Sequence, residues 1–219
     1  MQNRKSIDFR FNIFEKIIYT NKMNLIFITG PSGSGKTTIS KYISQNLSNS
    51  YILSTDNYYK TGFISKILSK FIKSYFDKIL SHDQGLIKKD IDYILKNNSI
   101  NHYYKYDFIK KVTKKNFKDF SNIQTLIVEG IFTLELTDFF SENQYLLIRL
   151  KEKKSTCRNR ISERDIIERG KNKIINSNEF NNGWRLYKKK EEKYRSKIFR
   201  GITLKKDLDL SFLLKKLSK

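Results

Sequence analysis

Eight consecutive residues near the start of the chain have the types and spacing of a phosphate-binding loop. They are Gly-Pro-Ser-Gly-Ser-Gly-Lys-Thr at positions 30–37, which fit the pattern G-x-x-x-x-G-K-[ST]. In such a loop the glycines turn backbone N–H groups toward phosphate oxygens, the lysine reaches the terminal phosphates, and the hydroxyl can bind Mg²⁺. The predicted nucleotide-binding residues are Gly30, Ser32, Gly33, Ser34, Gly35, Lys36, Thr37 and Thr38.

Two carboxylates stand at the ends of apolar segments. Asp56 follows the run at 51–54; there it could take the proton of an attacking hydroxyl or help to hold Mg²⁺, although an aspartate in a turn is often only a turn former. Glu129 closes the run TLIVE, where a protein with a phosphate loop is expected to make a second metal contact. The alternative for Glu129 is a solvent-exposed strand end. Gly130 after it allows a close approach of the backbone.

Arginines are concentrated in one segment of the chain. None lies between Phe11 and Ile148, whereas five fall within 21 residues: Arg149, Arg158, Arg160, Arg164 and Arg169. Arginine can bind phosphate through two parallel hydrogen bonds, which lysine cannot do. On a helix, Arg160 and Arg164 are one turn apart on the same face. We therefore expect a lid at about 152–170 that closes on the phosphates; the alternative is ion pairing with nearby acids on the surface.

The elements that must position these residues alternate between strands and helices. Apolar runs predict strands at 24–29, 51–54, 124–129 and 144–150. Apolar residues at helical spacing predict helices after the loop, over 63–80, around 87–95 and over 180–198, and the whole pattern between the second and third strands is helical. The predicted fold class is α/β, with a mainly parallel sheet flanked by helices in three layers and ligands at the carboxyl ends of the strands.

The net charge does not by itself identify a partner. The 219 residues include 44 basic and 22 acidic side chains, which gives a formal charge of +22. Of the basic residues 34 are lysines, scattered along most of the chain, so we expect a solvated lysine-rich surface rather than a nucleic-acid site. An interleaving of aromatic and basic residues of the RNA-binding type is not found in the sequence.

Other features concern location and domain organisation. The lone cysteine, Cys157, excludes an internal disulfide and fits a reducing cytosol, so we expect a cytoplasmic protein. No stretch approaches the roughly 18–20 apolar residues of a membrane span. We predict a basic N-terminal extension at 1–22 and a single domain at 23–219. The sequence leaves open whether the chain forms a homo-oligomer.

Five segments in order, GPSGSGKTT, STDNYYK, YDF, VEGIF and RDIIERG, resemble motifs of the uridine kinase and phosphoribulokinase family of P-loop kinases. The resemblance implies a nucleoside-kinase-like fold and transfer of the γ-phosphate of ATP, with Mg²⁺, to a hydroxyl of a small metabolite. It implies that Asp56 is the catalytic base near the metal and that Thr37 and Glu129 are linked to magnesium. The implied catalytic set is Lys36, Asp56, Arg160, Arg164 and Arg169, of which Arg160 is followed by Ile161 where the family usually has a second arginine.

The same resemblance suggests residues for the phosphate acceptor. Asp83 lies in the nearest match to a segment whose aspartate holds a ribose, although the proline of that segment is missing. Tyr106 and Asp107 belong to the Y-D-F segment, and Lys111 stands where the family has a histidine that meets the base. We expect a sugar or nucleoside that offers a hydroxyl, and Lys111 would suit an acceptor that carries an anion.

Two other classes of protein stand as alternatives. A switch-type P-loop ATPase would keep Lys36 and Thr37 without needing Asp56, and a nucleic-acid-binding ATPase would use the positive charge. Asp56, Glu129 and the arginines together favour transfer chemistry. A GTPase is rejected, because the nearest match to its N-K-x-D motif, at 21–24, lacks the acid and precedes the loop.

Overall fold

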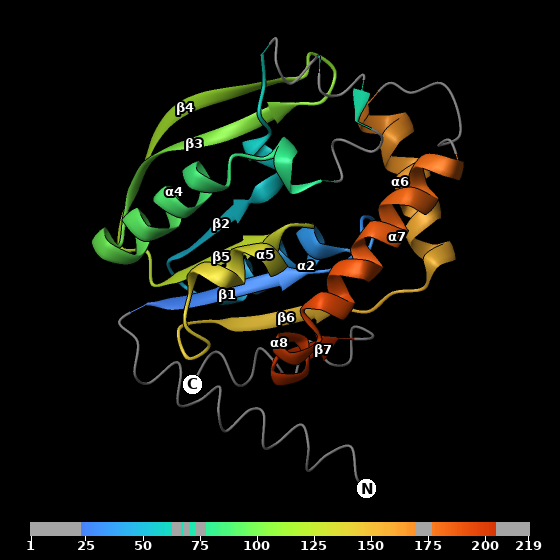
Figure 1. Ribbon diagram of the computed structural model, residues 1–219. Coiled ribbons are helices and arrows are strands. Elements are labelled where there is room, and N and C mark those ends of the chain that lie inside the picture. Colours follow the sequence, from blue (N-terminus) through green and yellow to red (C-terminus); the bar gives the residue numbers. More distant parts are fainter. Residues whose placement is uncertain (1–22, 63–66, 68–70, 73–77, 170–176, 205–219) are drawn as a thin grey trace, which may run out of the picture.

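The computed structural model describes residues 23–62, 67, 71–72, 78–169 and 177–204 of the 219-residue chain (Figure 1). The predicted N-terminal extension at 1–22 and most of the helix predicted over 63–80 lie outside these residues, so both stay predictions. The main elements in chain order are β1 (Asn24–Thr29), α2 (Lys36–Asn46), β2 (Ser50–Ser54), η1 (Thr55–Tyr58), η3 (Ile79–Ser81), α4 (Gln84–Asn97), β3 (Ile100–Asp107), β4 (Val112–Phe120), β5 (Thr125–Glu129), α5 (Thr133–Leu136), η4 (Thr137–Phe139), β6 (Leu146–Leu150), α6 (Lys154–Arg169), α7 (Ser177–Lys193), α8 (Arg195–Arg200) and β7 (Ile202–Leu204).

The central sheet is parallel, as predicted. Its strand order is β2-β5-β1-β6-β7, and every pairing between neighbours is parallel. Successive side chains of a strand point to opposite faces, so a strand covered on both sides is apolar throughout. Phe27 of β1 accordingly packs in the core on one face, while Ile26 and Ile28 pack in the core on the other. The chain passes from one side of β1 to the other, which places the ligand site of such sheets at its carboxyl end.

Helices cover both faces of the sheet and make it the middle of three layers. On one face α2 contributes Ile43 to a core with β1, β5 and β6. On the other face α4, α5, α7 and α8 pack against the sheet, with Ile87, Ile91 and Ile94 of α4 fully buried. The apolar spacing that predicted α4 and the aromatic stripe of α7 and α8 is therefore a core stripe. Figure 1 shows α6 and α7 beside the carboxyl ends of the strands.

The antiparallel hairpin β3–β4 was not predicted, and the expectation of a wholly helical pattern between the second and third strands was wrong here. The two strands form a separate sheet beside β2 (Figure 1). No residue of β4 is fully buried, so its sequence lacks the alternating apolar pattern that marks a half-buried strand. The hairpin is tied to the segment after β2, because Tyr106 donates its backbone N–H to Asn57 Oδ1 at 3.2 Å and Thr113 donates its hydroxyl to the Tyr59 carbonyl at 2.7 Å.

A buried carboxylate joins three elements beside this hairpin. Asp90 of α4 is 3% exposed. It accepts a hydrogen bond of 2.9 Å from the Tyr58 hydroxyl of η1, and His102 Nε2 of β3 lies 3.3 Å from its other oxygen. Because a buried carboxylate is costly unless its oxygens are paired, these contacts fix α4, η1 and β3 relative to one another.

Within the part of the chain that the structure describes, no helix combines the length and the apolar character needed to cross a bilayer.

Replacing Asp90 with alanine should destabilise the fold, because the Tyr58 hydroxyl and the His102 ring would lose their buried partner. We expect the free energy of unfolding to fall by about 1–3 kcal/mol in urea titrations. The matched control is Asp92→Ala on the same helix, where the side chain is 47% exposed and paired with Lys88 on the surface. That variant should lose less than about 0.5 kcal/mol. Equal losses in the two variants would contradict the structural role of Asp90.

Candidate active site

The phosphate loop connects β1 to α2, as the sequence predicted. Gly33 has a φ of +77°, a conformation that L side chains rarely adopt. A methyl group at Gly33 would also collide with the carbonyl oxygen of Cys157 in α6. The loop therefore needs glycine here for two reasons, its own turn and the close contact with the helix that carries the arginines.

Lys36 is held inside the loop. It is 8% exposed, and its Nζ donates to the carbonyl oxygens of Gly30 and Pro31 at 3.1 Å each. Burial lowers the pKa of Lys36, whereas the negative charges of Glu129 and Asp56 raise it. The two carboxylates thus oppose the effect of burial and favour the charged form of the lysine.

Glu129 closes β5 and faces the first turn of α2. Its Oε1 lies 3.3 Å from the Thr37 hydroxyl, and it is 4% exposed. Burial and the nearby charge of Asp56 raise the pKa of Glu129, while Lys36 and hydrogen bonds from Ser54 and Thr37 act in the opposite direction. The net effect raises the pKa of Glu129, with burial as the largest cause.

Asp56 lies in η1, directly after the carboxyl end of β2. Among the described residues its Oδ1 is buried and has no hydrogen-bond partner. Gly130 brings this segment close to the end of β5, because it has a φ of +147° and a methyl group there would collide with the Thr55 hydroxyl. This close approach places Asp56 and Glu129 within electrostatic reach of each other.

Helix α6 brings two of the predicted arginines toward the loop. The charge of Arg164 lowers the pKa of Lys36, after the larger effects of burial, Glu129 and Asp56. Arg160 Nη1 lies 3.8 Å from the point that a methyl group on Gly35 would occupy. The alternative that we considered for these arginines was ion pairing with nearby acids, and both also make such pairs. Arg164 pairs with Asp165 and Arg160 with Glu152, each at 3.3 Å. Arg169 is in α6, but its side chain lies outside the described residues.

These residues fit a nucleotide with its metal ion. The loop offers a cradle that side chains would fill, Lys36 and Arg164 supply positive charge, and Ser34 Oγ and Asp56 Oδ1 are buried without partners among the described residues. No group of three or more histidines, cysteines or acids that could hold a metal occurs in the described part of the chain. Oxygen ligands from Thr37 and two carboxylates suit Mg²⁺, which is commonly bound by few protein ligands and by substrate phosphates.

Asp83 and Tyr106, two of the predicted acceptor residues, lie next to the Asp56 segment. Asp83 caps α4 by accepting a hydrogen bond of 2.9 Å from the Leu86 backbone, and its own N–H donates to the Tyr58 carbonyl at 2.9 Å. The buried ring of Tyr106 packs on Tyr59, with ring centres 4.7 Å apart. Both residues thus contact the segment that carries Asp56.

Asp107 and Lys111 lie at the turn of the hairpin. Asp107 Oδ1 accepts hydrogen bonds of 2.9 Å from the backbone N–H groups of Lys110 and Ile109, which lower its pKa. Lys111 is exposed and has a φ of +53°. The structure therefore uses one oxygen of Asp107 to cap the turn and holds Lys111 at the tip.

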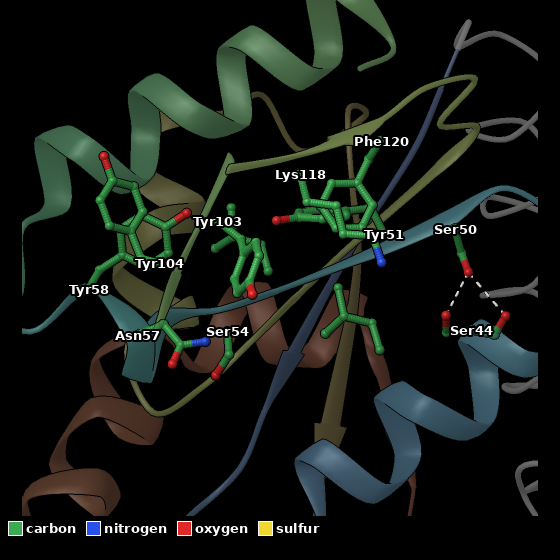
Figure 2. Close-up of a pocket in the computed structure, with 12 residues that line it drawn as sticks. Ser44, Ser50, Tyr51, Ser54, Asn57, Tyr58, Tyr103, Tyr104, Lys118 and Phe120 are labelled. Atoms are coloured by element: carbon green, nitrogen blue, oxygen red, sulfur yellow. Dashed lines mark hydrogen bonds between the residues drawn. The ribbon is translucent and has the colours of Figure 1, made fainter. Parts of the chain in front are cut away.

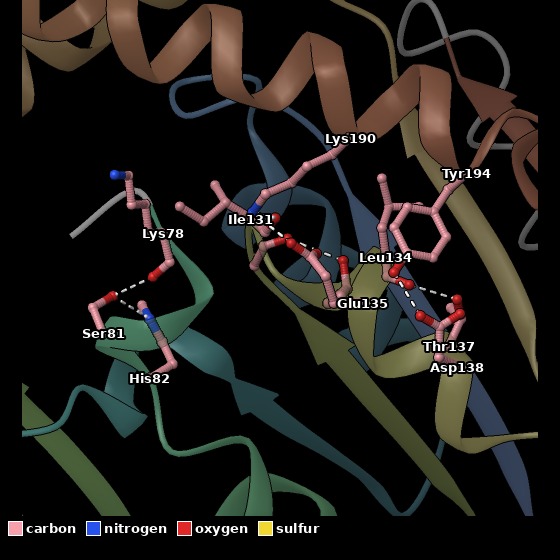
Figure 3. Close-up of polar contacts among 12 residues, drawn as sticks. Lys78, Ser81, His82, Ile131, Leu134, Glu135, Thr137, Asp138, Lys190 and Tyr194 are labelled. Atoms are coloured by element: carbon pink, nitrogen blue, oxygen red, sulfur yellow. Dashed lines mark hydrogen bonds and ion pairs between the residues drawn. The ribbon is translucent and has the colours of Figure 1, made fainter. Parts of the chain in front are cut away.

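A stack of rings beside the site was not identified from the sequence. His82 packs between Tyr59 and Phe132, with ring centres at 3.9 and 4.1 Å. Lys190 of α7 places its Nζ 3.8 Å from the centre of the Phe132 ring and pairs with Glu135 at 2.8 Å (Figure 3). These residues come from four distant parts of the chain, so no spacing rule could have grouped them.

A cavity of about 370 Å³ lies between β2 and the hairpin β3–β4 (Figure 2). Ser54 and Asn57, which flank the Thr55–Asp56 pair, both line it. Neither Asp56 nor any residue of the phosphate loop is among its lining residues, so the cavity is distinct from the group of side chains around the loop. The lining residues are Ser44, Ser50, Tyr51, Ile52, Leu53, Ser54, Asn57, Tyr58, Tyr103, Tyr104, Lys118 and Phe120.

Known proteins resemble this chain in both sequence and fold. Residues 26–181 match the family described as AAA domain. A uridine kinase of Borrelia turicatae is 34% identical over 153 residues, which are 68% of this chain and 70% of that protein. The structure of a possible uridine kinase from Bacillus stearothermophilus has a TM-score of 0.55 at 19% identity and covers 93% of this chain and 100% of its own.

A D-glycerate 3-kinase from Cryptococcus neoformans has a TM-score of 0.59 at 12% identity, with 89% of each chain covered. The two structural matches show the fold, and the sequence match shows the family. Together they support an enzyme that transfers a phosphoryl group to a small molecule, and they do not favour a nucleic-acid-binding or switch-type ATPase. The chain belongs to the uridine kinase family of P-loop kinases.

Proposed function

We propose that this enzyme uses Mg²⁺-ATP and transfers the γ-phosphate to a hydroxyl of a nucleoside or a similar ring-bearing sugar. The observation that carries the proposal is the convergence of Lys36, Thr37, Asp56, Glu129 and Arg164 at the carboxyl ends of three parallel strands. Phosphoryl transfer needs little covalent chemistry from the protein, and depends on positioning and on neutralising charge. This set of side chains is suited to both tasks.

Each side chain has a role that follows from its place. Lys36 binds the terminal phosphates and offsets their charge, and Thr37 and Glu129 hold the metal ion. Bound Mg²⁺ neutralises phosphate charge. Asp56 Oδ1, buried without a protein partner among the described residues, accepts the proton of the attacking hydroxyl. Arg164, with Arg160 and Arg169, stabilises the charge that develops on the transferred group and closes over it as a lid.

The acceptor binds beside Asp56 in this proposal. Asp83 contacts the Asp56 segment through its backbone, and its carboxylate would hold sugar hydroxyls. Tyr106 and the rings packed against it offer an apolar wall for a flat ring. Uridine is the first acceptor to test, because the similar protein of Borrelia turicatae is named a uridine kinase. Asp107 and Lys111, at the hairpin turn, would meet only a group that extends beyond that ring.

Asp56→Asn should separate binding from transfer. We expect ATP affinity, measured by calorimetry with Mg²⁺, to change less than about threefold, while acceptor-dependent ADP release falls by roughly 10²–10⁴-fold because the proton acceptor is lost. Lys36→Ala should instead weaken ATP binding itself. Asp92→Asn, on the exposed face of α4, is the matched control and should keep full activity. Undiminished turnover in Asp56→Asn would remove Asp56 as the base.

Arg164→Ala should lower kcat by about 10²–10³-fold and change the KM for the acceptor little, because its charge acts mainly on the transferring phosphoryl group. Arg195→Ala is the control, since that side chain is 80% exposed on α8. Hydrogen exchange of residues 155–164 should slow only when nucleotide and acceptor are both present. Equal protection in the free enzyme would mean that α6 is a static helix rather than a lid.

The acceptor itself is identified by a screen. ADP release should be fastest with uridine or cytidine if the ring wall and Asp83 determine the choice. If an acceptor that carries an anion is faster, Lys111→Ala should raise its KM by about 10-fold and leave the KM of a neutral acceptor unchanged. A result in which Lys111→Ala affects both acceptors equally would exclude a role for Lys111 in recognising the anion.

A further inference from the structure

His82 occupies an unusual position for a histidine. Its side chain is 1% exposed, and its ring packs on Tyr59 on one side and Phe132 on the other. Backbone hydrogen bonds hold it in place, because Lys60 donates to the Ser81 carbonyl at 2.7 Å and Asp83 donates to the Tyr58 carbonyl at 2.9 Å. His82 is thereby fixed against the segment that follows Asp56.

The hydrogen bonds of Ser81 determine which nitrogen of His82 carries the proton. Ser81 Oγ donates to the carbonyl oxygen of Lys78 at 2.7 Å, and a hydroxyl has one proton to give. Its contact of 2.8 Å with His82 Nδ1 must therefore be donated by the ring (Figure 3). Nδ1 is protonated, and Nε2 carries a free lone pair. Burial, together with the charges of Lys190 and Lys60, lowers the pKa of His82 to about 3, so the ring is neutral.

The lone pair of His82 Nε2 is buried and has no hydrogen-bond partner among the described residues. Buried polar atoms in folded proteins are almost always paired, and an exception calls for an explanation. A phenylalanine would make the same ring contacts with Tyr59 and Phe132 and would bury no unpaired atom, at the loss of the hydrogen bond from Nδ1 to Ser81 Oγ. Ring packing and the Ser81 contact therefore account for the ring and for Nδ1, and they leave Nε2 unexplained.

The ring stack lies on the acceptor side of the proposed transfer site. Tyr59 follows Asp56 by three residues and also packs on Tyr106. Phe132 follows Glu129 by three residues, and Asp83 is the next residue after the histidine. An acceptor whose hydroxyl reaches Asp56 and whose ring lies against this wall would come next to His82.

We propose that His82 is a specificity-determining residue, whose Nε2 accepts a hydrogen bond from an N–H or O–H group of the phosphate acceptor. This inference rests on the proposed function. A site built to pair with a donor rejects an analogue that lacks it, because the buried lone pair is then left unsatisfied. The donor is either a ring N–H, as in the imide of uracil, or a sugar hydroxyl, and the test distinguishes the two.

The test compares the enzyme with His82→Phe, which keeps the stacked ring and removes both nitrogens. We expect the KM for uridine, or for the best acceptor of the screen, to rise by about 10-fold, with the KM for ATP unchanged within twofold. Acceptor analogues then locate the donor: 3-methyluridine lacks the ring N–H, and 2′-deoxyuridine and 3′-deoxyuridine each lack one hydroxyl. The analogue that lacks the contacted donor should bind the native enzyme and His82→Phe equally. The comparison of two enzymes with two ligands is a double-mutant cycle between residue and ligand.

The control is His102→Phe, at the other histidine of the chain. That variant loses the contact with Asp90 but should keep the same preference among the analogues. His82→Gln and His82→Asn form a second pair, since glutamine can place an acceptor near the Nε2 position and asparagine near Nδ1. Glutamine should preserve more of the discrimination than asparagine, and this comparison serves if the phenylalanine variant does not fold.

An unchanged preference among the analogues in His82→Phe, or equal discrimination by the glutamine and asparagine variants, would overturn the inference while leaving the kinase activity in place. A native enzyme that binds ATP but releases no ADP with any acceptor would overturn the proposed function, and with it the role of His82. The two failures are thus distinguishable in one set of assays.

Discussion

The charge balance around Lys36 is the constraint on which the site depends. Burial lowers the pKa of Lys36, which is 8% exposed, and burial raises the pKa of the Glu129 carboxyl, so each group depends on an opposite charge nearby to stay ionised. Glu129 and Asp56 supply negative charge near Lys36, and Lys36 supplies positive charge near Glu129. Glu129 closes β5, Asp56 follows β2, and Lys36 begins α2 after the loop that follows β1. The strand order β2-β5-β1 brings these strand ends together, so the sheet topology and the electrostatics of the site require each other.

Close backbone contacts convert that topology into a site. Gly130 lets the segment after β2 approach the end of β5, and Gly33 lets the phosphate loop lie against α6. The first contact positions Asp56, and the second places the helix that carries the arginines over the loop. A side chain at either glycine would force apart elements whose charged groups must be near each other. The phosphate side of the site is therefore closely packed at these two points, with charge and backbone contacts both acting over short distances.

The proposed acceptor side is built differently, from elements that the central sheet does not determine. The hairpin β3–β4, the start of α4 and the residues after β2 and β5 meet through stacked rings and through the buried Asp90. Polar side chains among these rings can therefore differ between proteins that share the fold, while the residues that bind phosphate stay the same. In our proposal, the buried His82 supplies this group of stacked rings with one neutral hydrogen-bond acceptor. This arrangement fits a fold that is shared by enzymes named for different acceptors, among them uridine and D-glycerate.

The sequence by itself determined the phosphate side. Residues of the loop, the strand before it and the helix after it are contiguous, so local patterns predicted them. Asp56 and Glu129 became candidates because both stand at the ends of apolar runs, and the structure places both at strand ends. The acceptor wall was decided by the tertiary structure. The strands of the hairpin have exposed faces and therefore lack a clear apolar pattern, and Tyr59, His82, Phe132 and Lys190 are too far apart in the chain for any spacing to group them. Whether Nε2 of His82 has a partner depends on those packed neighbours, which a sequence does not specify.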